Sequence, residues 1–275
     1  MCAEGKRKAG RILKIILFGS HARNDWVDEA LTGKGYVSDF DLLVIVNQAD
    51  LTDLDLWDKA DERLSLELYV LKTSRTPVNF IVHTLKEVND ALAKGTSFHM
   101  DLARDGIALY ELNDSELHRP RPKEPADALA QAREHFETNF PPAMKRFEIA
   151  KFAISNRFTN EAAFDLHQTV EKLYNCALLV MTSYSPKRHN IAALRGMADK
   201  LDRRIVDVWP RESRKDRALF TKLRDAYVKS RYSKHYEIDL DELNWLVERI
   251  ETLGQVIHMV CEEKIASLKR TAGEI

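Results

Sequence analysis

The sequence predicts an α+β protein in which a mixed β-sheet with flanking helices precedes an all-α helical bundle. Short β-rich apolar runs alternate with helical segments over the first 115 residues. After residue 126 the apolar residues recur almost throughout at i, i+3 and i+4, the spacing of amphipathic helices. Between the two rhythms, "HRPRPKEP" (118–125) has the proline and basic content of a stiff, solvated linker. We therefore expect domains at 1–117 and 127–275, joined by a linker at 118–126.

The first domain carries the signals of strands and helices in alternation. Apolar runs rich in β-branched residues predict the strands, and Gly106 opens a final edge strand. The strands are expected at 11–18, 40–46, 76–84 and 106–111. Apolar residues at helical spacing predict helices at 53–71 and 85–95, the second ending on Gly95. This order indicates a mixed sheet with helices packed on it.

The second domain reads as five helices with short connections, which is typical of a bundle. The expected helices span 143–155, 161–181, 190–201, 215–232 and 239–268. Asn190 and Asp239 stand where the third and fifth helices begin, and both residue types favour the N-cap position because their side chains accept from free backbone N–H groups.

Composition excludes several classes of function. The 275 residues carry a net charge of −1, which argues against a general electrostatic grip on nucleic acid or on an anionic membrane. No apolar run approaches the 18 or so residues of a membrane span, so no membrane partner is expected. Cys2, Cys176 and Cys261 are far apart and match no metal-ligand spacing. We interpret them as free thiols in a reducing compartment, and expect a cytoplasmic protein.

The stretch "ILFGSHARND" ends an apolar strand on Gly19 and Ser20. A glycine there lets the backbone approach a ligand, and the following amides can face phosphate oxygens. Ser20 adds a hydroxyl, and Arg23 can direct a guanidinium at the same triphosphate. We therefore take Gly19, Ser20 and Arg23 as candidate nucleotide-binding residues.

The next strand opens with "SDFDLLVIV", where Asp39 and Asp41 are two residues apart. Alternation along a strand sends both carboxylates to one face. Two carboxylates beside a phosphate-holding loop are suited to holding Mg²⁺ between protein and nucleotide. Each motif alone is commonly structural; their combination is what favours a site, with Asp39 and Asp41 as its metal-binding and catalytic residues.

The combined pattern over residues 11–112 resembles minimal nucleotidyltransferases of the DNA polymerase β superfamily. The resemblance implies that Gly19 and Ser20 bind a nucleoside triphosphate, with ATP expected, and that Asp39 and Asp41 bind Mg²⁺ or Mn²⁺. It further implies transfer of the nucleoside monophosphate to a hydroxyl of a protein, an RNA or a small molecule, with release of pyrophosphate.

The sequence departs from that family at the third carboxylate. The matching strand, "PVNFIVHT", places Asn79 at that position, and an amide cannot serve as a base at neutral pH. His83 shares the strand face and could accept a proton on chemistry alone, and Glu67 is another conceivable carboxylate. A satisfied strand-end histidine and a solvated helical glutamate are the more ordinary interpretations. Turnover is therefore less secure than nucleotide binding.

The helical half resembles the HEPN domain. The matching strings are "AAFDLHQTVEKLYNCALL", "KRHNIAAL" and "LRDAYVKSRY". The resemblance implies self-association, so we expect a homodimer through the helical domain. Some HEPN domains are metal-independent ribonucleases with an Arg followed after four to six residues by a His. The matching Arg is Arg224, but positions 229–231 hold no histidine; the alternative pair is Arg231 and His235, which share a helix face if the helix continues.

Further residues of the helical half have both bland and functional interpretations. His167 and Glu171 are one turn apart; a buried hydrogen bond is the more ordinary interpretation and a catalytic or metal site the sharper one. His189 is expected to shape the loop before Asn190. In toxin–antitoxin pairs related to this resemblance the transferase modifies a tyrosine of its HEPN partner, which makes three tyrosines candidate acceptors. They are Tyr227, Tyr232 and Tyr236.

Two rival functions remain open at this point. One is a HEPN-type ribonuclease, or a toxin–antitoxin-like fusion, in which the nucleotidyltransferase half regulates the helical half. The other, motivated by Asn79, is a nucleotide sensor that binds a triphosphate without releasing pyrophosphate.

Overall fold

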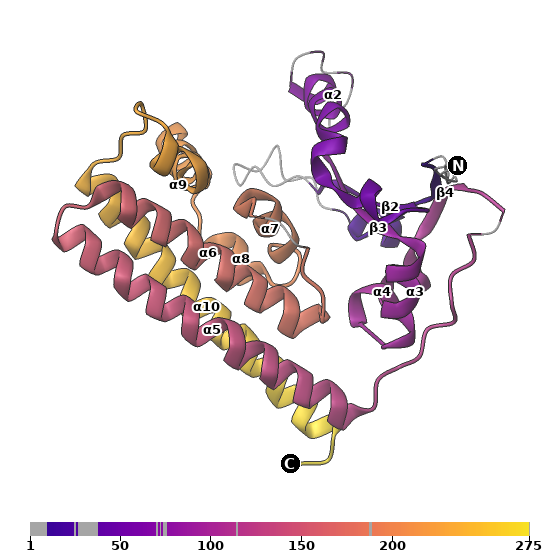
Figure 1. Ribbon diagram of the computed structural model, residues 1–275. Coiled ribbons are helices and arrows are strands. Elements are labelled where there is room, and N and C mark those ends of the chain that lie inside the picture. The colour runs from indigo at the N-terminus through magenta and orange to yellow at the C-terminus, as the bar shows by residue number, and fades with distance from the viewer. Residues whose placement is uncertain are drawn as a thin grey trace, which may run out of the picture. The chain divides into compact units, whose positions relative to one another are not determined.

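The computed structural model describes residues 10–24, 26, 38–69, 71, 73, 76–113, 115–186 and 189–274. The chain divides into two compact units, Met1–Pro122 and Lys123–Ile275. The first holds a four-stranded mixed sheet and the second is helical, so the predicted α+β class is confirmed (Figure 1).

The sheet of the first unit has the strand order β3-β2-β1-β4. Its strands are β1 (Ile12–Phe18), β2 (Phe40–Val46), β3 (Val78–Thr84) and β4 (Ile107–Glu111). β1 is antiparallel to both β2 and β4, whereas β2 and β3 are parallel. All four strands fall where the apolar runs predict them, because each run is short, β-rich and bounded by polar or glycine residues.

The helices of the first unit lie between these strands. They are α1 (Ser20–Arg23), η1 (Ala49–Thr52), η2 (Leu54–Trp57), α2 (Asp58–Tyr69), α3 (Leu85–Ala93) and α4 (Ser97–Asp105). Thr84 and Glu87 form a capping box at the start of α3, and Gly95 follows that helix with φ of 64°, as the glycine predicts. The segment expected as one helix at 53–71 begins as η2 and becomes α-helical only at Asp58. The sequence did not reveal α4, a helix of nine residues in which His99 and Leu102 are buried.

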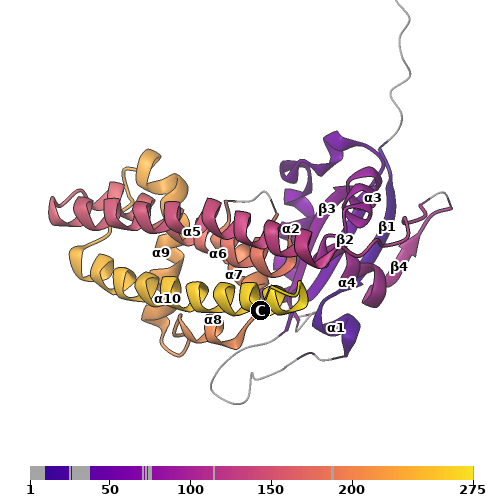
Figure 2. The ribbon, with the colours of Figure 1, turned by 90° about the horizontal axis from the view of Figure 1, so that it is seen from below.

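The second unit contains six helices in its described residues. They are α5 (Pro125–Ser155), α6 (Thr159–Thr182), α7 (Ile191–Ala198), α8 (Arg203–Asp207), α9 (Arg214–Tyr232) and α10 (Leu240–Thr271). α6 packs against α5, α7, α9 and α10, and the long helices α5, α6 and α10 run side by side in both views (Figures 1 and 2). The five expected helices are all present, and Asn190 and Asp239 cap α7 and α10 as predicted.

Two helices of the bundle differ from the prediction. α5 begins at Pro125 rather than at 143, and runs through Pro141 and Pro142. A proline inside a helix removes a hydrogen bond, but the turns before Pro141 are held by the buried side chains of Leu129 and Phe136. The five-residue α8 is too short to show a helical period.

Tyr174, Phe147 and Trp209 are the largest fully buried side chains of the second unit's core. The Trp209 indole N–H donates to the Tyr174 hydroxyl at 2.8 Å, which satisfies a polar group that would otherwise be costly to bury. Cys176 and Cys261 are free and buried, and Cys2 lies outside the described residues. Within the described part of the chain, no helix has the length and apolar character needed to cross a membrane.

Candidate functional site

The end of β1 and the start of β2 lie next to each other because the two strands are antiparallel. Phe18 pairs with Asp41 in their register, and Asp41 pairs with Asn79 of the parallel strand β3. The residues that follow β1, those that open β2 and the first residues of β3 therefore meet at one end of the sheet. The sequence separates them by up to 60 positions, and the topology brings them together.

Gly19 is required at this turn on two counts. Its φ of 77° is a conformation that residues with a side chain rarely adopt. A Cβ added there would also lie 2.6 Å from Oδ2 of Asp41, so the Asp41 carboxylate fills the space in which a side chain would stand. The turn and the buried carboxylate are thus built against each other.

Ser20 presents a polar atom that the described structure does not satisfy. Its Oγ is buried and has no hydrogen-bond partner among the described residues. A buried hydroxyl without a partner costs about 1–3 kcal/mol, and such groups in a native fold call for an explanation such as a ligand. The hydroxyl lies directly after Gly19, where the sequence predicts a phosphate contact.

Asp39, Asp41 and Asn79 gather at the same end of the sheet. Asp39 immediately precedes β2, and Asp41 is buried at 4% exposure. Nδ2 of Asn79 donates a hydrogen bond to Oδ2 of Asp39, so the amide that replaces the expected third carboxylate is engaged with the first aspartate. This position holds a hydrogen-bond donor to the carboxylate pair in place of a further negative charge.

Arg23 ends α1, and its backbone N–H donates to the Gly19 carbonyl at 3.2 Å. Asp105, at the end of α4, lies within electrostatic reach of Arg23. Its pKa is lowered first by a hydrogen bond from Arg104 and, among the smaller causes, by the charge of Arg23. The guanidinium expected to meet the triphosphate therefore belongs to the same neighbourhood as the Gly19 turn.

The other groups considered as a catalytic base lie elsewhere. His83 pairs with Ile45, four residues farther along β3 than the Asn79–Asp41 pair, and is 3.7 Å from the Glu87 carboxylate. Glu67 accepts from Arg63 on the surface of α2 at 2.9 Å. Both follow the ordinary interpretation, a strand-end histidine and a solvated ion pair.

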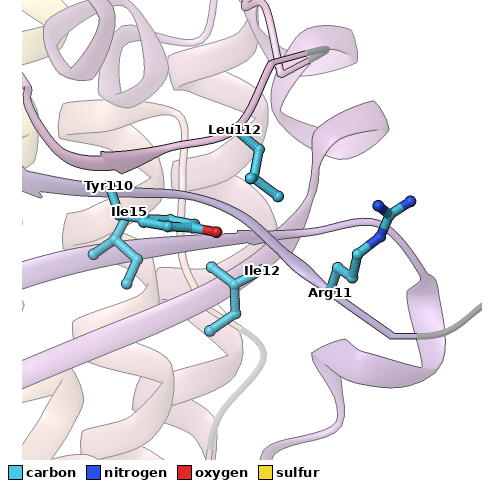
Figure 3. Close-up of a pocket in the computed structure, with 5 residues that line it drawn as sticks. All are labelled: Arg11, Ile12, Ile15, Tyr110 and Leu112. Carbon is cyan, nitrogen blue, oxygen red and sulfur yellow. The ribbon is translucent and has the colours of Figure 1, made fainter.

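The pocket shown in Figure 3 is separate from this site. Its volume is about 520 Å³, and Ile12, Ile15 and the ring of Tyr110 gather at it, with Arg11 on its other side. Ile12 pairs with Val46, at the opposite end of the β1–β2 ladder from Phe18 and Asp41. The pocket and the Gly19 site therefore lie at opposite ends of the β1–β2 ladder, and this pocket plays no part in the site.

The residues at the Gly19 turn fit a divalent cation only in part. Asp39 and Asp41 carry the oxygen ligands that Mg²⁺ prefers, and the buried Ser20 hydroxyl, which has no partner among the described residues, could donate to a phosphate oxygen. Within the described residues, no group of three or more His, Cys, Asp or Glu side chains is placed to hold a metal. Two carboxylates without a third suit a cation that also takes ligands from a bound nucleotide.

In the helical unit, the predicted residues Arg224 and Arg231 lie on α9, and His235 does not. Arg224 pairs with the neighbouring Asp225 at 2.8 Å. Arg231 lies over the rings of Phe164 and Tyr227, 4.7 and 5.0 Å from their centroids. The helix ends at Tyr232 because Ser233 is extended. The expectation that Arg231 and His235 share a helix face is therefore wrong.

His167 forms a buried junction between three segments. The side chain is fully buried, with Nδ1 3.0 Å from the Leu223 carbonyl of α9 and Nε2 3.1 Å from the His189 carbonyl. The Glu171 carboxylate lies 3.7 Å from Nε2. His167 is therefore a packing element of the bundle, as the ordinary interpretation predicts, but its shortest polar contacts, at hydrogen-bond distance, are to backbone carbonyls and not to the Glu171 carboxylate.

His189 is the histidine that the bundle places beside α9. Its Nδ1 is 3.1 Å from Oε1 of Glu171, and its ring stacks on Tyr227 with centroids 4.7 Å apart. Burial raises the pKa of Glu171, but hydrogen bonds from His167 and His189 outweigh burial, and the pKa is lowered overall. The His189 side chain is 63% exposed, so a carboxylate-oriented imidazole faces solvent.

These helices match a known family. The model of the HEPN domain aligns with residues 140–264, from within α5 to within α10. Residues 140–264 form a HEPN domain. A search of curated proteins found no match to the chain.

The HEPN domain separates the three candidate tyrosines by accessibility. Tyr236 is buried, its hydroxyl donates to the Lys222 carbonyl at 3.1 Å, and burial raises its pKa. Tyr227 lies half-buried between His189 and Arg231. Tyr232 is 75% exposed, so it is the tyrosine of the three that a separate active site can reach.

His189 was expected only to shape the loop before Asn190, and the Arg–His pair was expected along α9 alone. The contacts of His189 with Glu171 and Tyr227 were not predicted. The signal was present in "KRHNIAAL", because a histidine directly before the Asn190 cap is held at a fixed point on the bundle. Its partners Glu171 and Tyr227 are 18 and 38 positions away in sequence, so only the packing of α6 and α9 brings them together.

Proposed function

We propose that the N-terminal unit is a nucleotidyltransferase that binds a nucleoside triphosphate, with ATP expected, together with Mg²⁺ or Mn²⁺. It transfers the nucleoside monophosphate to a hydroxyl acceptor. The observation that carries the proposal is the buried hydroxyl of Ser20, which has no partner among the described residues and follows a positive-φ turn at Gly19 that is packed against Asp41.

Each residue of the proposed site has a part that its position supports. Gly19 makes the positive-φ turn and lets the backbone pass close to the Asp41 carboxylate, Ser20 donates its hydroxyl to a phosphate oxygen, and Arg23 offsets negative charge. Asp39 and Asp41 would hold the cation. When bound, the cation neutralises phosphate charge and favours displacement at phosphorus.

The proposed reaction is an exchange of phosphorus–oxygen bonds. The acceptor oxygen bonds to the α-phosphorus, the bond from that phosphorus to the bridging oxygen breaks, and pyrophosphate leaves. The acceptor proton passes to solvent, because Asn79 is an amide and cannot take it. We therefore expect slow turnover with unactivated alcohols and faster transfer to an acidic hydroxyl such as a phenol. Among the three tyrosines of the HEPN domain considered above, Tyr232 has the exposure that an acceptor needs.

The test is pyrophosphate release and label transfer from α-labelled triphosphates by the full chain. The variant Asp39→Asn/Asp41→Asn should lose release by about a thousandfold, since it removes both metal ligands. Asp50→Asn, an exposed aspartate in η1 beyond the other end of β2, is the matched control and should behave as wild type. Label on the protein that disappears in Tyr232→Phe would identify the acceptor. Triphosphate binding without release, with RNA and small alcohols supplied, would favour the sensor instead.

A second candidate function belongs to the HEPN domain and rests on the exposed, Glu171-oriented His189. In RNA cleavage a 2′-oxygen bonds to the adjacent phosphorus, the 5′-oxygen leaves, and a base takes the 2′ proton. His189 is exposed and is oriented by a carboxylate, as such a base must be. Arg231 of α9 also contacts the Tyr227 ring and supplies positive charge nearby. We expect any such cleavage to persist in EDTA and to be lost in His189→Gln. His235→Gln is the matched control, and a loss confined to His235→Gln would contradict this assignment.

A further inference from the structure

Three aromatic rings form a stack beside the Gly19 turn. The imidazole of His21 lies parallel to the indole of Trp26, at an interplanar angle of 7° and a centroid distance of 5.6 Å. The same imidazole also contacts the ring of Phe40, which is tilted by 40°, at a centroid distance of 4.3 Å. None of these rings has a part in the proposed reaction.

The stack is interleaved in sequence with the residues of the site. His21 follows Ser20, whose buried hydroxyl has no partner among the described residues, and Phe40 stands between Asp39 and Asp41 in the chain, with its ring on the opposite face of the strand from the two carboxylates. Nε2 of His21 is 3.3 Å from the Ser38 carbonyl, which ties α1 to the segment before β2. The rings are therefore attached to the same two segments that would hold the triphosphate and the cation.

Trp26 is the exposed member of the stack. Trp26 is 50% exposed to solvent, whereas His21 and Phe40 are less exposed and only partly buried. Covering the exposed surface of a large aromatic side chain with a partner is favourable because it removes apolar area from water. Stacking on a fixed imidazole holds the plane of the indole and offers a flat apolar surface within reach of the phosphate-binding turn.

We infer that Trp26, stacked on His21, is the platform on which the base of the nucleotide lies, and that the site favours purine over pyrimidine nucleoside triphosphates. This inference rests on the proposed nucleotide site. Stacking on an aromatic ring tolerates any base because each has a π-face, and the larger face of a purine covers more of the indole. Trp26 would therefore determine specificity by stacking on the base, whereas the residues of the Gly19 turn would contact the phosphates.

The experiment compares binding of ATP, CTP and inorganic triphosphate, each with Mg²⁺, to the full chain by calorimetry. Trp26→Ala should raise the Kd for ATP about tenfold to a hundredfold, the loss expected for one base–aromatic stack. It should leave inorganic triphosphate binding unchanged, because that ligand has no base. Trp26→Phe should restore most of the affinity for ATP. Tyr110→Ala is the matched control, since Tyr110 is 44% exposed but lines the pocket at the other end of β1.

The outcomes separate this inference from the proposed function. Equal binding of ATP by Trp26→Ala and wild type, or an equal loss of ATP and inorganic triphosphate binding in Trp26→Ala, would overturn the base platform and leave the nucleotide site standing. Failure of the wild-type chain to bind either ligand would overturn the nucleotide site, and the platform with it. Tighter binding of CTP than of ATP by wild type would overturn the purine preference.

Discussion

Two clusters of polar groups, one in each unit, differ in how completely the protein satisfies them. At the Gly19 turn, the Ser20 hydroxyl is buried without a partner among the described residues, and an amide replaces a carboxylate beside Asp39. Around His167, both ring nitrogens contact carbonyl oxygens, and Glu171 accepts from neighbouring side chains.

The difference indicates what each cluster contributes. A buried polar network that is satisfied within the fold stabilises one arrangement of its elements; here α6, α9 and the residues before α7 are joined at His167. A hydroxyl left without a partner lowers stability and is ready to bind something else. We therefore assign stability mainly to the His167 cluster and ligand binding to the Gly19 turn. Each assignment can be tested separately.

The largest expected effect is on stability in the HEPN domain. Replacing His167 with Leu removes the side-chain partner of the Leu223 and His189 carbonyls and one of the two histidines beside Glu171, and it leaves His189 as the remaining one. We expect a loss of about 3–5 kcal/mol in the free energy of unfolding, as when one partner of a buried pair is removed. Urea titration followed by circular dichroism measures it. A loss below about 1 kcal/mol would mean that the network contributes little to stability.

The next effect is on binding at the other cluster. Gly19→Ala forces a side chain into the positive-φ conformation and against Oδ2 of Asp41. We expect about a hundredfold rise in the Kd for Mg²⁺–ATP, because the turn must open and move Ser20. Calorimetry gives the Kd. Gly273→Ala, which also has positive φ but meets no atom within 4 Å, is the control for backbone strain alone. Unchanged ATP binding in Gly19→Ala would contradict the assignment of the turn.

A smaller effect distinguishes a transferase from a sensor at the same site. Asn79→Asp replaces the amide beside Asp39 with a third carboxylate. We expect about a tenfold gain in pyrophosphate release, since a carboxylate can bind metal and take a proton. Asn79→Ala, which removes the amide without adding a carboxylate, should not show the gain. Equal rates of pyrophosphate release for wild type and Asn79→Asp would contradict the claim that the lack of a carboxylate at position 79 limits turnover.

The smallest effect is a pH dependence in the His167 cluster. The folded-state pKa of Glu171 is lowered, so its ionisation stabilises the fold above the unfolded-state value of about 4.5. That contribution is lost as the pH falls below 4.5 and through the folded-state pKa. The stability difference between wild type and Glu171→Gln should therefore be largest near pH 6 and shrink toward pH 3. A difference that grows on acidification would contradict the direction of this shift.

Much of the fold could be read from the sequence because it rests on local patterns. The strand Phe40–Val46 was predicted to the residue, since a short β-rich run has sharp polar borders. The first half of α5 was missed because Pro141 and Pro142 mark a boundary locally, whereas burial of side chains such as Phe136 overrides it. Helix α9 ends at Tyr232, where the sequence predicts its end, so the continuation that would have carried His235 onto the face of Arg231 is absent.

The candidate sites divide in the same way. Gly19, Ser20, Asp39 and Asp41 lie in two short motifs, so their chemistry could be recognised before their proximity was known. The partner of Asp39, Asn79, required an alignment to a strand 40 positions away. The His189–Tyr227 stack and the Trp26–His21 stack depend on packing between elements, and neither follows from spacing along the chain.

The most direct test of the central claim is calorimetric binding of ATP to the full chain, with and without Mg²⁺, in wild type and in Asp39→Asn/Asp41→Asn. We expect ATP binding that requires Mg²⁺ in wild type and is lost in the double variant. Urea unfolding of the HEPN domain should be the same in both proteins. ATP binding of equal strength in both proteins, or no binding by wild type with Mg²⁺ or Mn²⁺ present, would contradict the central claim.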